Sequence, residues 1–208
     1  MRDLRILCLH GFRGSGAALR AQLQPLSAYW GPRVELVYVD APPLAEGGPG
    51  WWNAVPIEGG EPHAKHYRGW AATRDWLVSW FEQSGPIDGV LGFSQGAALT
   101  GLLVGMRSAG EPATLERPLS FGFALLVSGF MSNDPVHAAL YQAPRSFALP
   151  SLHLIGRSDR IVPREASLAL AARFENPQVV EHDGGHVIAS SAEVRATVSE
   201  FLTRQRES

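Results

Sequence analysis

The stretch Gly92-Phe93-Ser94-Gln95-Gly96 decides the fold, because of the segments on its two sides. Apolar residues 87–91 precede it, and the small-residue run 97–103 follows it. A strand, a sharp turn and a helix in this order form a nucleophile elbow, whose turn forces the central serine into a strained, exposed conformation. The two glycines of the stretch fit this interpretation, because a Cβ atom at either would collide with the adjoining strands and helix. The context therefore predicts Ser94 as a nucleophile.

Length and composition indicate one globular domain, residues 1–208, with a single continuous core. A net charge of −2 with interspersed signs gives no reason to expect nucleic acid or an anionic membrane as a partner. The one cysteine, Cys8, lies in an apolar run and is expected to be a buried thiol, so no disulfide framework is predicted. The N-terminal residues do not resemble a signal peptide, and no apolar window approaches the roughly 20 residues of a membrane span. These features predict a cytoplasmic location.

Apolar runs of strand length alternate with amphipathic stretches of helix length. Strands are expected at 4–9, 34–39, 87–91, 121–127, 152–155 and 178–182, and helices near 16–29, 69–84, 95–109, 163–174 and 191–204. Most of the strands are nearly continuous in Val, Ile and Leu, which is typical of strands buried on both faces. The alternation predicts an α/β fold with a mostly parallel, doubly wound sheet of about six strands flanked by helices. In such sheets, functional sites collect at the carboxyl ends of the strands.

Two irregular stretches interrupt this alternation, near 41–68 and 129–150. The first holds five prolines and the pair Trp51-Trp52, and the second includes Phe130. Loops of this length in a compact domain are usually functional or disordered. We expect the three aromatic residues to line a substrate pocket. The alternative is that the two tryptophans simply cap the core.

A serine nucleophile needs a base, and the best candidate among the seven histidines is His186. It follows Asp183-Gly184-Gly185 directly after the last predicted strand, where a tight loop would carry the imidazole above the sheet. Asp159 is the best candidate for the acid that orients this base, because it follows the predicted strand 152–155. Ser94, Asp159 and His186 then appear in the chain order of the α/β-hydrolases. Asp183 is the main competitor of Asp159, but Asp183 is more naturally placed to brace its own turn.

An oxyanion needs hydrogen-bond donors, and two backbone N–H groups are expected to supply them. The N–H of Gln95, the residue after the nucleophile, is one by geometry. The loop 10–16 follows the first strand, and the N–H of Phe12 is our choice for the second. His10 is then expected to brace this loop. The glycine spacing matches no phosphate-binding motif, and the histidines form no metal-binding pattern, so neither a nucleotide nor a metal is predicted.

The chain resembles a family of small serine hydrolases, the FSH family, which includes fungal members and a human ovarian-tumour-associated homologue. The matching segments are 7–12, 51–52, 93–99, 126–130, 150–153, Gly156 with Asp159, and 184–186. The resemblance implies an α/β-hydrolase fold, the triad Ser94, Asp159 and His186, and Phe12 and Gln95 as oxyanion donors. Bacterial carboxylesterases and acyl-protein thioesterases look similar around residues 10–11 and the elbow. Residues 40–67 are the family's most variable part, so an acyl preference cannot be carried over.

Together these features predict a serine hydrolase of small-molecule carboxylic esters or thioesters that works through an acyl-enzyme and needs no cofactor. The first alternative is an acyltransferase, or a thioesterase of the acyl-protein or polyketide type, with the same triad. A non-catalytic ligand-binding module is the second. The sequence alone leaves the oligomeric state open.

Overall fold

A computed structural model of the chain describes residues 2–44, 48–61, 63–110, 119–141 and 147–207. Its main sheet has six strands in the order β2-β1-β5-β6-β7-β8. Every neighbouring pair in this sheet runs parallel. The strands are β1 (Leu4–Leu9), β2 (Val34–Val39), β5 (Gly89–Phe93), β6 (Phe123–Val127), β7 (Ser151–Gly156) and β8 (Gln178–His182). The predicted parallel sheet is therefore confirmed.

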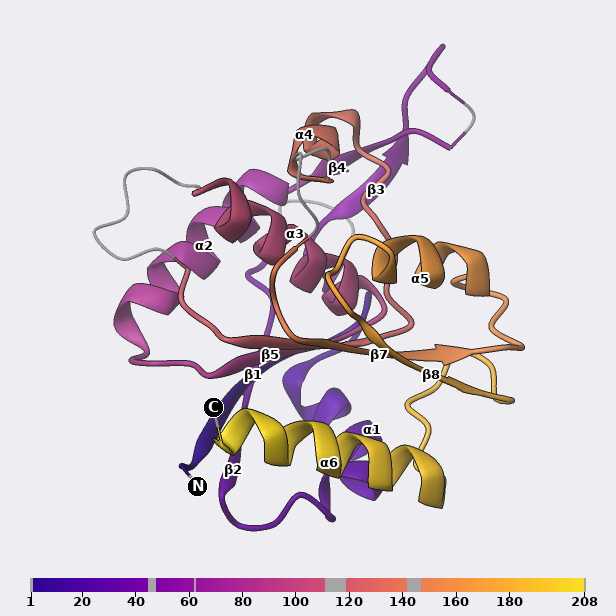
Figure 1. The fold of residues 1–208 in the computed structure, drawn as a ribbon. Helices are drawn as coiled ribbons and strands as arrows, with labels where there is room; N and C mark the ends of the chain where they lie inside the picture. Colours follow the sequence, from indigo (N-terminus) through magenta and orange to yellow (C-terminus); the bar gives the residue numbers. More distant parts are fainter. Residues whose placement is uncertain (1, 45–47, 62, 111–118, 142–146, 208) are drawn as a thin grey trace.

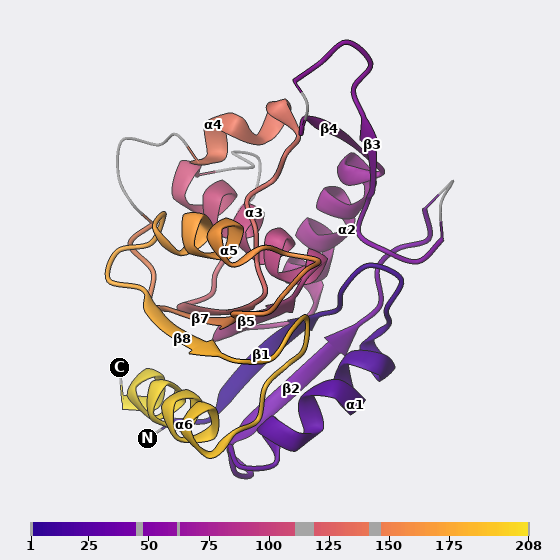
Figure 2. The same cartoon turned by 90° about the vertical axis from the view of Figure 1, so that its right-hand side faces the viewer.

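Helices cover both faces of this sheet, which makes the fold doubly wound (Figure 1). On one face lie α1 (Gly16–Ser27) and α6 (Ala192–Glu207). On the other lie α2 (Trp70–Gln83), α3 (Gln95–Ala109) and α5 (Arg164–Ala171), an arrangement also visible after a 90° turn (Figure 2). The two ends of the chain lie side by side, where the Arg2 N–H donates to the Arg206 carbonyl. None of the helices in the described ranges is both long and apolar enough to cross a membrane.

The strand side chains alternate between two hydrophobic cores, one on each face of the sheet. On β1, Leu7 and Leu9 enter the core under α2 and α3. Ile6 and Cys8 enter the core under α1 and α6. Cys8 is fully buried as predicted, and burial raises the pKa of its thiol. Strands buried on both faces explain why the sequence shows continuous apolar runs instead of alternation.

The element bounds differ from the predicted ones mainly at their ends. The strand before the elbow begins at Gly89 instead of residue 87, because Asp88 is occupied at the amino edge of the sheet. The Asp88 N–H donates to the Arg5 carbonyl, and its carboxylate accepts from Arg5 N–H and pairs with Arg2. The predicted helix 163–174 is shorter, since α5 ends at Ala171.

The two stretches that the sequence presents as irregular contain regular elements. An antiparallel hairpin of β3 (Asn53–Pro56) and β4 (Lys65–Arg68) lies within 41–68. A 3₁₀ turn, η1 (Pro135–His137), and the short helix α4 (Ala138–Tyr141) lie within 129–150. The hairpin stands beyond the carboxyl edge of the sheet, next to α4 (Figures 1 and 2). Residues 45–47, 62 and 142–146 of the two stretches lie outside the described residues.

Candidate active site

Ser94 occupies the turn between β5 and α3 in a backbone conformation that is unfavourable for a serine. Its φ and ψ angles are 55° and −117°. The glycines on either side permit the tight approach that this turn requires. A Cβ on Gly92 would lie 2.2 Å from the Gly96 carbonyl oxygen, and one on Gly96 would lie 2.0 Å from the Leu9 carbonyl oxygen. The strained elbow that the sequence predicts is therefore present, and it holds the Ser94 side chain at the carboxyl edge of the sheet.

Three side chains from three different loops meet at this edge. Ser94 Oγ lies 2.9 Å from His186 Nε2, and His186 Nδ1 lies 2.7 Å from Asp159 Oδ2. Asp159 follows β7, and His186 follows β8. A carboxylate can only accept, so the network assigns the imidazole proton to Nδ1 and leaves the Nε2 lone pair facing the serine hydroxyl. In this arrangement the imidazole can take the hydroxyl proton.

The Asp159 carboxylate is held in place by the loop that carries it. Its side chain is 1% exposed. Its Oδ1 accepts from the N–H groups of Ile161 and Val162, both at 2.9 Å. Burial acts to raise the pKa of Asp159, but hydrogen bonds from Val162, His186 and Ile161 outweigh it and hold that pKa below its usual value. Asp159 is therefore an anion that faces His186.

Asp183, the competing acid, points elsewhere. Its carboxylate pairs with Arg157 at 2.7 Å, and its side chain is 93% exposed. An exposed pair of this kind braces the surface turn and contributes little stability. In this structure Asp159, not Asp183, therefore lies against the imidazole.

The other histidines in the core have structural partners. His10 Nε2 accepts from the Ala41 N–H at 3.1 Å, and its Nδ1 lies 2.8 Å from the Gly11 carbonyl, so the ring braces its loop as predicted. His153 contacts Ser151 inside the core, and burial lowers its pKa to about 3. It lies within β7.

The two expected oxyanion donors lie beside the elbow. Gln95 is the first residue of α3, so its N–H belongs to the positive end of the helix dipole. Gly11 packs directly against the elbow, and a Cβ there would lie 3.3 Å from the Ser94 Cβ, which places the start of the 12–16 loop next to Ser94. Within the described residues, no hydrogen-bond acceptor contacts the N–H of Phe12 or Gln95.

Residues 1–198 match a known family, the serine hydrolase (FSH1) family. The chain belongs to this family. It is 34% identical to esterase OVCA2 of Xenopus tropicalis over 98% of this chain and 94% of that protein. It is also 34% identical to esterase OVCA2 of Homo sapiens, over 99% of this chain and 98% of that protein. The predicted family membership is confirmed.

The fold of this FSH1 serine hydrolase is that of solved esterases and thioesterases. The crystal structure of Zea mays acyl-protein thioesterase 2 superposes with a TM-score of 0.69 and covers 99% of this chain and 94% of that one. At 21% identity this likeness concerns the fold alone. The predicted α/β-hydrolase fold is confirmed.

The Gln95 side chain ties the elbow of this serine hydrolase to the tryptophan pair. Its Oε1 accepts from the Trp51 N–H at 3.0 Å, and its Nε2 donates to the Trp52 carbonyl at 2.9 Å. The Trp51 indole donates to the His10 carbonyl, and the Thr73 hydroxyl donates to the Trp51 carbonyl. Sequence reasoning considered only the backbone of Gln95. The signal for this role, which the sequence analysis did not use, is a polar side chain between Ser94 and a helix of small residues.

The two indole rings are 0% and 1% exposed, and Trp52 stacks on Tyr67 with ring centroids 4.6 Å apart. Their burial agrees with the alternative interpretation, in which Trp51 and Trp52 cap the core. A direct contact of either ring with substrate stays a prediction.

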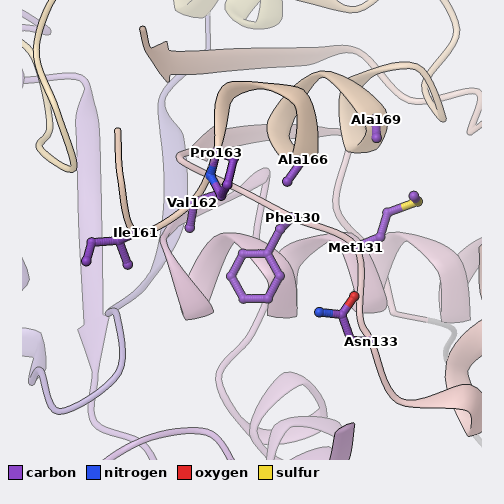
Figure 3. Close-up of a pocket in the computed structure, with 8 residues that line it drawn as sticks. All are labelled: Phe130, Met131, Asn133, Ile161, Val162, Pro163, Ala166 and Ala169. Atoms are coloured by element: carbon purple, nitrogen blue, oxygen red, sulfur yellow. The ribbon is translucent and has the colours of Figure 1, made fainter. Parts of the chain in front are cut away.

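Phe130, the third residue expected in a substrate pocket, does line a cavity (Figure 3). The cavity has a volume of about 380 Å³. One wall is the segment after β6, and the other is the end of the β7–α5 loop together with the start of α5. The lining residues are Phe130, Met131, Asn133, Ile161, Val162, Pro163, Ala166 and Ala169. This mostly apolar cavity adjoins Asp159, because Ile161 and Val162, which line it, donate their N–H groups to the Asp159 carboxylate.

Residues 130–137, here called the strap, are fastened to the hairpin by contacts that the sequence does not signal. Asp134 is buried, and its carboxylate accepts from the Tyr67 N–H at 2.7 Å and from the Val136 N–H at 3.1 Å. The Asn133 N–H donates to the Tyr67 hydroxyl, and the Asn133 carbonyl accepts from the Lys65 N–H. One wall of the cavity is thereby fixed to β4.

No group of three or more described His, Cys, Asp or Glu side chains is placed to hold a metal ion.

Proposed function

We propose that this chain hydrolyses carboxylic esters through an acyl-enzyme formed on Ser94. The observation that carries the proposal is the continuous hydrogen-bonded series from Ser94 Oγ through His186 to Asp159, at 2.9 and 2.7 Å. Such a series supplies a nucleophile, a base and an orienting anion. The names of the curated relatives, which are esterases, support the same reaction class.

In the first half of the reaction, Ser94 Oγ attacks the acyl carbon while His186 Nε2 takes the hydroxyl proton. The resulting imidazolium is stabilised by the Asp159 anion at Nδ1 and gives its proton to the leaving alcohol. Water then enters, loses a proton to His186 and attacks the acyl carbon. The tetrahedral intermediate formed in this way breaks its bond to Ser94 Oγ, which releases the carboxylic acid, and His186 returns the proton to Ser94. The cycle needs no cofactor.

The oxyanion of each tetrahedral intermediate is proposed to accept hydrogen bonds from the N–H groups of Phe12 and Gln95. Two features favour these donors: both amides lack a partner among the described residues, and Gln95 begins α3. The helix dipole adds to the stabilisation of a negative charge at this position. Loss of one such donor typically costs about 10²–10³ in rate.

The acyl group is proposed to lie in the cavity beside Phe130. Its walls are mostly apolar, and among the residues that line it none carries a charge. An uncharged hydrocarbon chain gains free energy by burial there, whereas a carboxylate would lose its hydration without a partner. A thioester with the same acyl group is a second substrate of the same chemistry.

The cytoplasmic location expected from the sequence stays a prediction.

The proposal is tested by hydrolysis of p-nitrophenyl esters from acetyl to palmitoyl. We expect turnover that Ser94→Ala reduces by about 10⁴-fold or more. A Ser94→Ala protein that keeps the activity would refute the nucleophile. Folded protein without turnover on any ester or matching thioester would favour the ligand-binding module, and products made only with an added alcohol would favour the acyltransferase.

The cavity is tested separately with Ala166→Phe, which fills it from α5. Activity on octanoyl and longer esters should fall at least about tenfold while acetyl ester hydrolysis is retained, because one missing or added methylene is worth about 10-fold or more in a fitted apolar pocket. Ala172→Phe, at the exposed end of the same helix, is the matched control. Equal chain-length profiles in the two variants would remove the cavity from the substrate site.

A further inference from the structure

The two proposed oxyanion donors lie on segments that the sheet alone does not hold together. Phe12 lies on the loop after β1, and Gln95 lies at the start of α3. β1 and β5 pair in register as far as Leu9 and Gly92. Both donors come after this register, so the distance between their N–H groups depends on contacts outside the sheet. Donors stabilise an oxyanion when they lie about 2.7–3.1 Å from it, so this spacing affects the rate.

The loop that carries Phe12 includes a backbone conformation that is unfavourable by itself. Arg13 follows Phe12 directly and has a φ of 57°, in the left-handed region that residues with a side chain seldom adopt. Strained conformations of this kind persist only where the surrounding structure holds them. Here the Arg13 N–H donates to the Pro49 carbonyl at 2.8 Å. The loop is therefore held from outside by residues 49–52, here called the clamp.

The clamp contacts the segments of both donors. On the loop after β1, the His10 carbonyl accepts from the Trp51 indole N–H at 2.7 Å. At the start of α3, Gln95 Oε1 accepts from the backbone N–H of Trp51 at 3.0 Å. Gln95 Nε2 donates to the Trp52 carbonyl at 2.9 Å. Trp51 thus joins the two segments, one through its side chain and the other through its backbone.

The clamp is closely packed against both donor residues. A Cβ on Gly50 would lie 2.8 Å from Phe12 Cδ2 and 3.1 Å from Gln95 Oε1, so the Phe12 ring and the Gln95 amide lie against the same point of the clamp. Trp51 is 0% exposed, and its carbonyl accepts from the Thr73 hydroxyl of α2. Buried polar networks whose members are all satisfied are rigid. The clamp is therefore suited to fix a distance.

We propose that the clamp sets the spacing of the two oxyanion donors and that the Gln95 side chain is the positioning residue through which it acts. This inference rests on the proposed function, because it assumes that Phe12 and Gln95 donate to the oxyanion. The Gln95 N–H is one donor, and its side chain fixes, through Trp51, the loop that carries the other. Within the described residues, no hydrogen bond joins the clamp to His186 or Asp159. The clamp should therefore affect the oxyanion and not the proton transfer.

The experiment compares Gln95→Met, which keeps the length of the side chain without its hydrogen bonds, with the unsubstituted protein. The kcat and KM for p-nitrophenyl acetate are measured across pH. Binding of an alkyl trifluoromethyl ketone is followed by fluorine NMR, which needs no turnover. Ser94 Oγ adds to the ketone carbon, the hydroxyl proton passes to His186, and the carbonyl oxygen becomes an oxyanion. This adduct reports on the oxyanion donors directly.

We expect kcat of Gln95→Met to fall by about 10²-fold with KM unchanged, the effect of losing one oxyanion donor. The dissociation constant of the ketone adduct should rise by a similar factor, because the adduct resembles the transition state. The midpoint of the pH profile should not move, since His186 keeps its partners. Thr100→Val is the matched control, because it removes a buried hydrogen bond to the Gly96 carbonyl within the same helix. It should change neither kcat nor the affinity for the ketone.

Trp51→Phe removes only the indole donor to His10 and tests the clamp independently if Gln95→Met does not fold. It should cause a smaller loss of the same kind. The double variant should lose less than the product of the two single losses, because both substitutions act on one clamp. Unchanged kcat and ketone affinity in the single variants would overturn the inference, and so would losses that simply multiply or an equal loss in Thr100→Val. An unsubstituted protein that forms no adduct would refute the proposed function, and this inference with it.

Discussion

The carboxyl edge of the main sheet and the hairpin with its strap are built on different principles. At the edge, backbone approaches backbone: a Cβ on Gly96 would lie 2.0 Å from the Leu9 carbonyl, and Ser94 holds a strained φ of 55°. In the hairpin and strap, single side chains do the fastening, above all the buried Asp134 carboxylate on the Tyr67 and Val136 amides. The proposed chemistry thus depends on the closely packed carboxyl edge of the sheet. One wall of the cavity depends instead on the hairpin and strap, which single side-chain contacts hold together.

The largest effect expected from this comparison is on the reaction at the edge. Asp159→Asn should lower kcat by about 10³–10⁴-fold, because an amide favours the wrong imidazole tautomer. Asp183→Asn is the control, since Asp183 pairs with Arg157 at the surface, and it should leave kcat unchanged. The kinetics of p-nitrophenyl acetate hydrolysis measure both. If the two variants lost activity equally, the acid would not be Asp159 alone.

A second substitution tests the rigidity of the edge itself. Gly96→Ala should destabilise the protein by about 1–3 kcal/mol or more, because the new methyl group overlaps the Leu9 carbonyl. Gly122→Ala is the matched control, since its Cβ would make an ordinary contact of 3.5 Å with the Asp88 carbonyl. Urea denaturation followed by circular dichroism gives both free energies of unfolding. Equal stability of the two variants would show that the elbow tolerates side chains and is not close-packed.

A smaller effect, on substrate affinity, is expected in the hairpin and strap. Asp134→Asn replaces one of the two acceptor oxygens with a donor, so the strap should loosen at the cost of about 1–3 kcal/mol for an amide left unpaired. KM for octanoyl esters should rise several-fold while kcat for acetyl esters changes little. Asp75→Asn, at an exposed pair with Arg74, serves as the control. A loss of kcat on acetyl esters without a change in KM would show that the strap acts on the chemistry, and the carboxyl edge and the strap would then not differ in role.

The smallest expected effect is on stability in acid. Because the Asp159 pKa is lower in the folded chain than its ordinary value of 3.8, its anion stabilises the fold fully above about pH 4. That contribution is lost as the pH falls through the lowered pKa. Urea unfolding between pH 2 and pH 6 should therefore show a steeper loss for the unsubstituted protein than for Asp159→Asn. Parallel curves would mean that the carboxyl is not stabilised as an anion.

The edge could be predicted from the sequence because its determinants are local. A continuous apolar strand, a glycine-flanked serine and a helix of small residues fix where Ser94 stands, and parallel strands bring Asp159 and His186 to the same edge. Family resemblance pointed to the same residues. The start of β5 differs from the predicted one because the Asp88 carboxylate accepts from the Arg5 N–H and pairs with Arg2. These contacts join segments that are far apart in the chain.

The hairpin and the strap could not be predicted in the same way, because their determinants are not local. Pro56 and a cluster of glycines obscure the short strands of the hairpin. The hairpin is also held by Asp134, which accepts from the Tyr67 N–H and lies 67 residues after Tyr67. The tryptophan pair looked like a pocket wall because aromatic residues in an irregular stretch commonly are one. Burial against His10 and Tyr67 is visible only in the folded chain.

The most direct test of the central claim is to trap the nucleophile. The protein is treated with a fluorophosphonate, which phosphonylates activated serines and releases fluoride, and the modified peptide is located by mass spectrometry. The account predicts one adduct, on Ser94, that is absent in Ser94→Ala and forms far more slowly in His186→Ala and Asp159→Asn. An adduct on another residue, or labelling of Ser94 at an equal rate without His186, would contradict it.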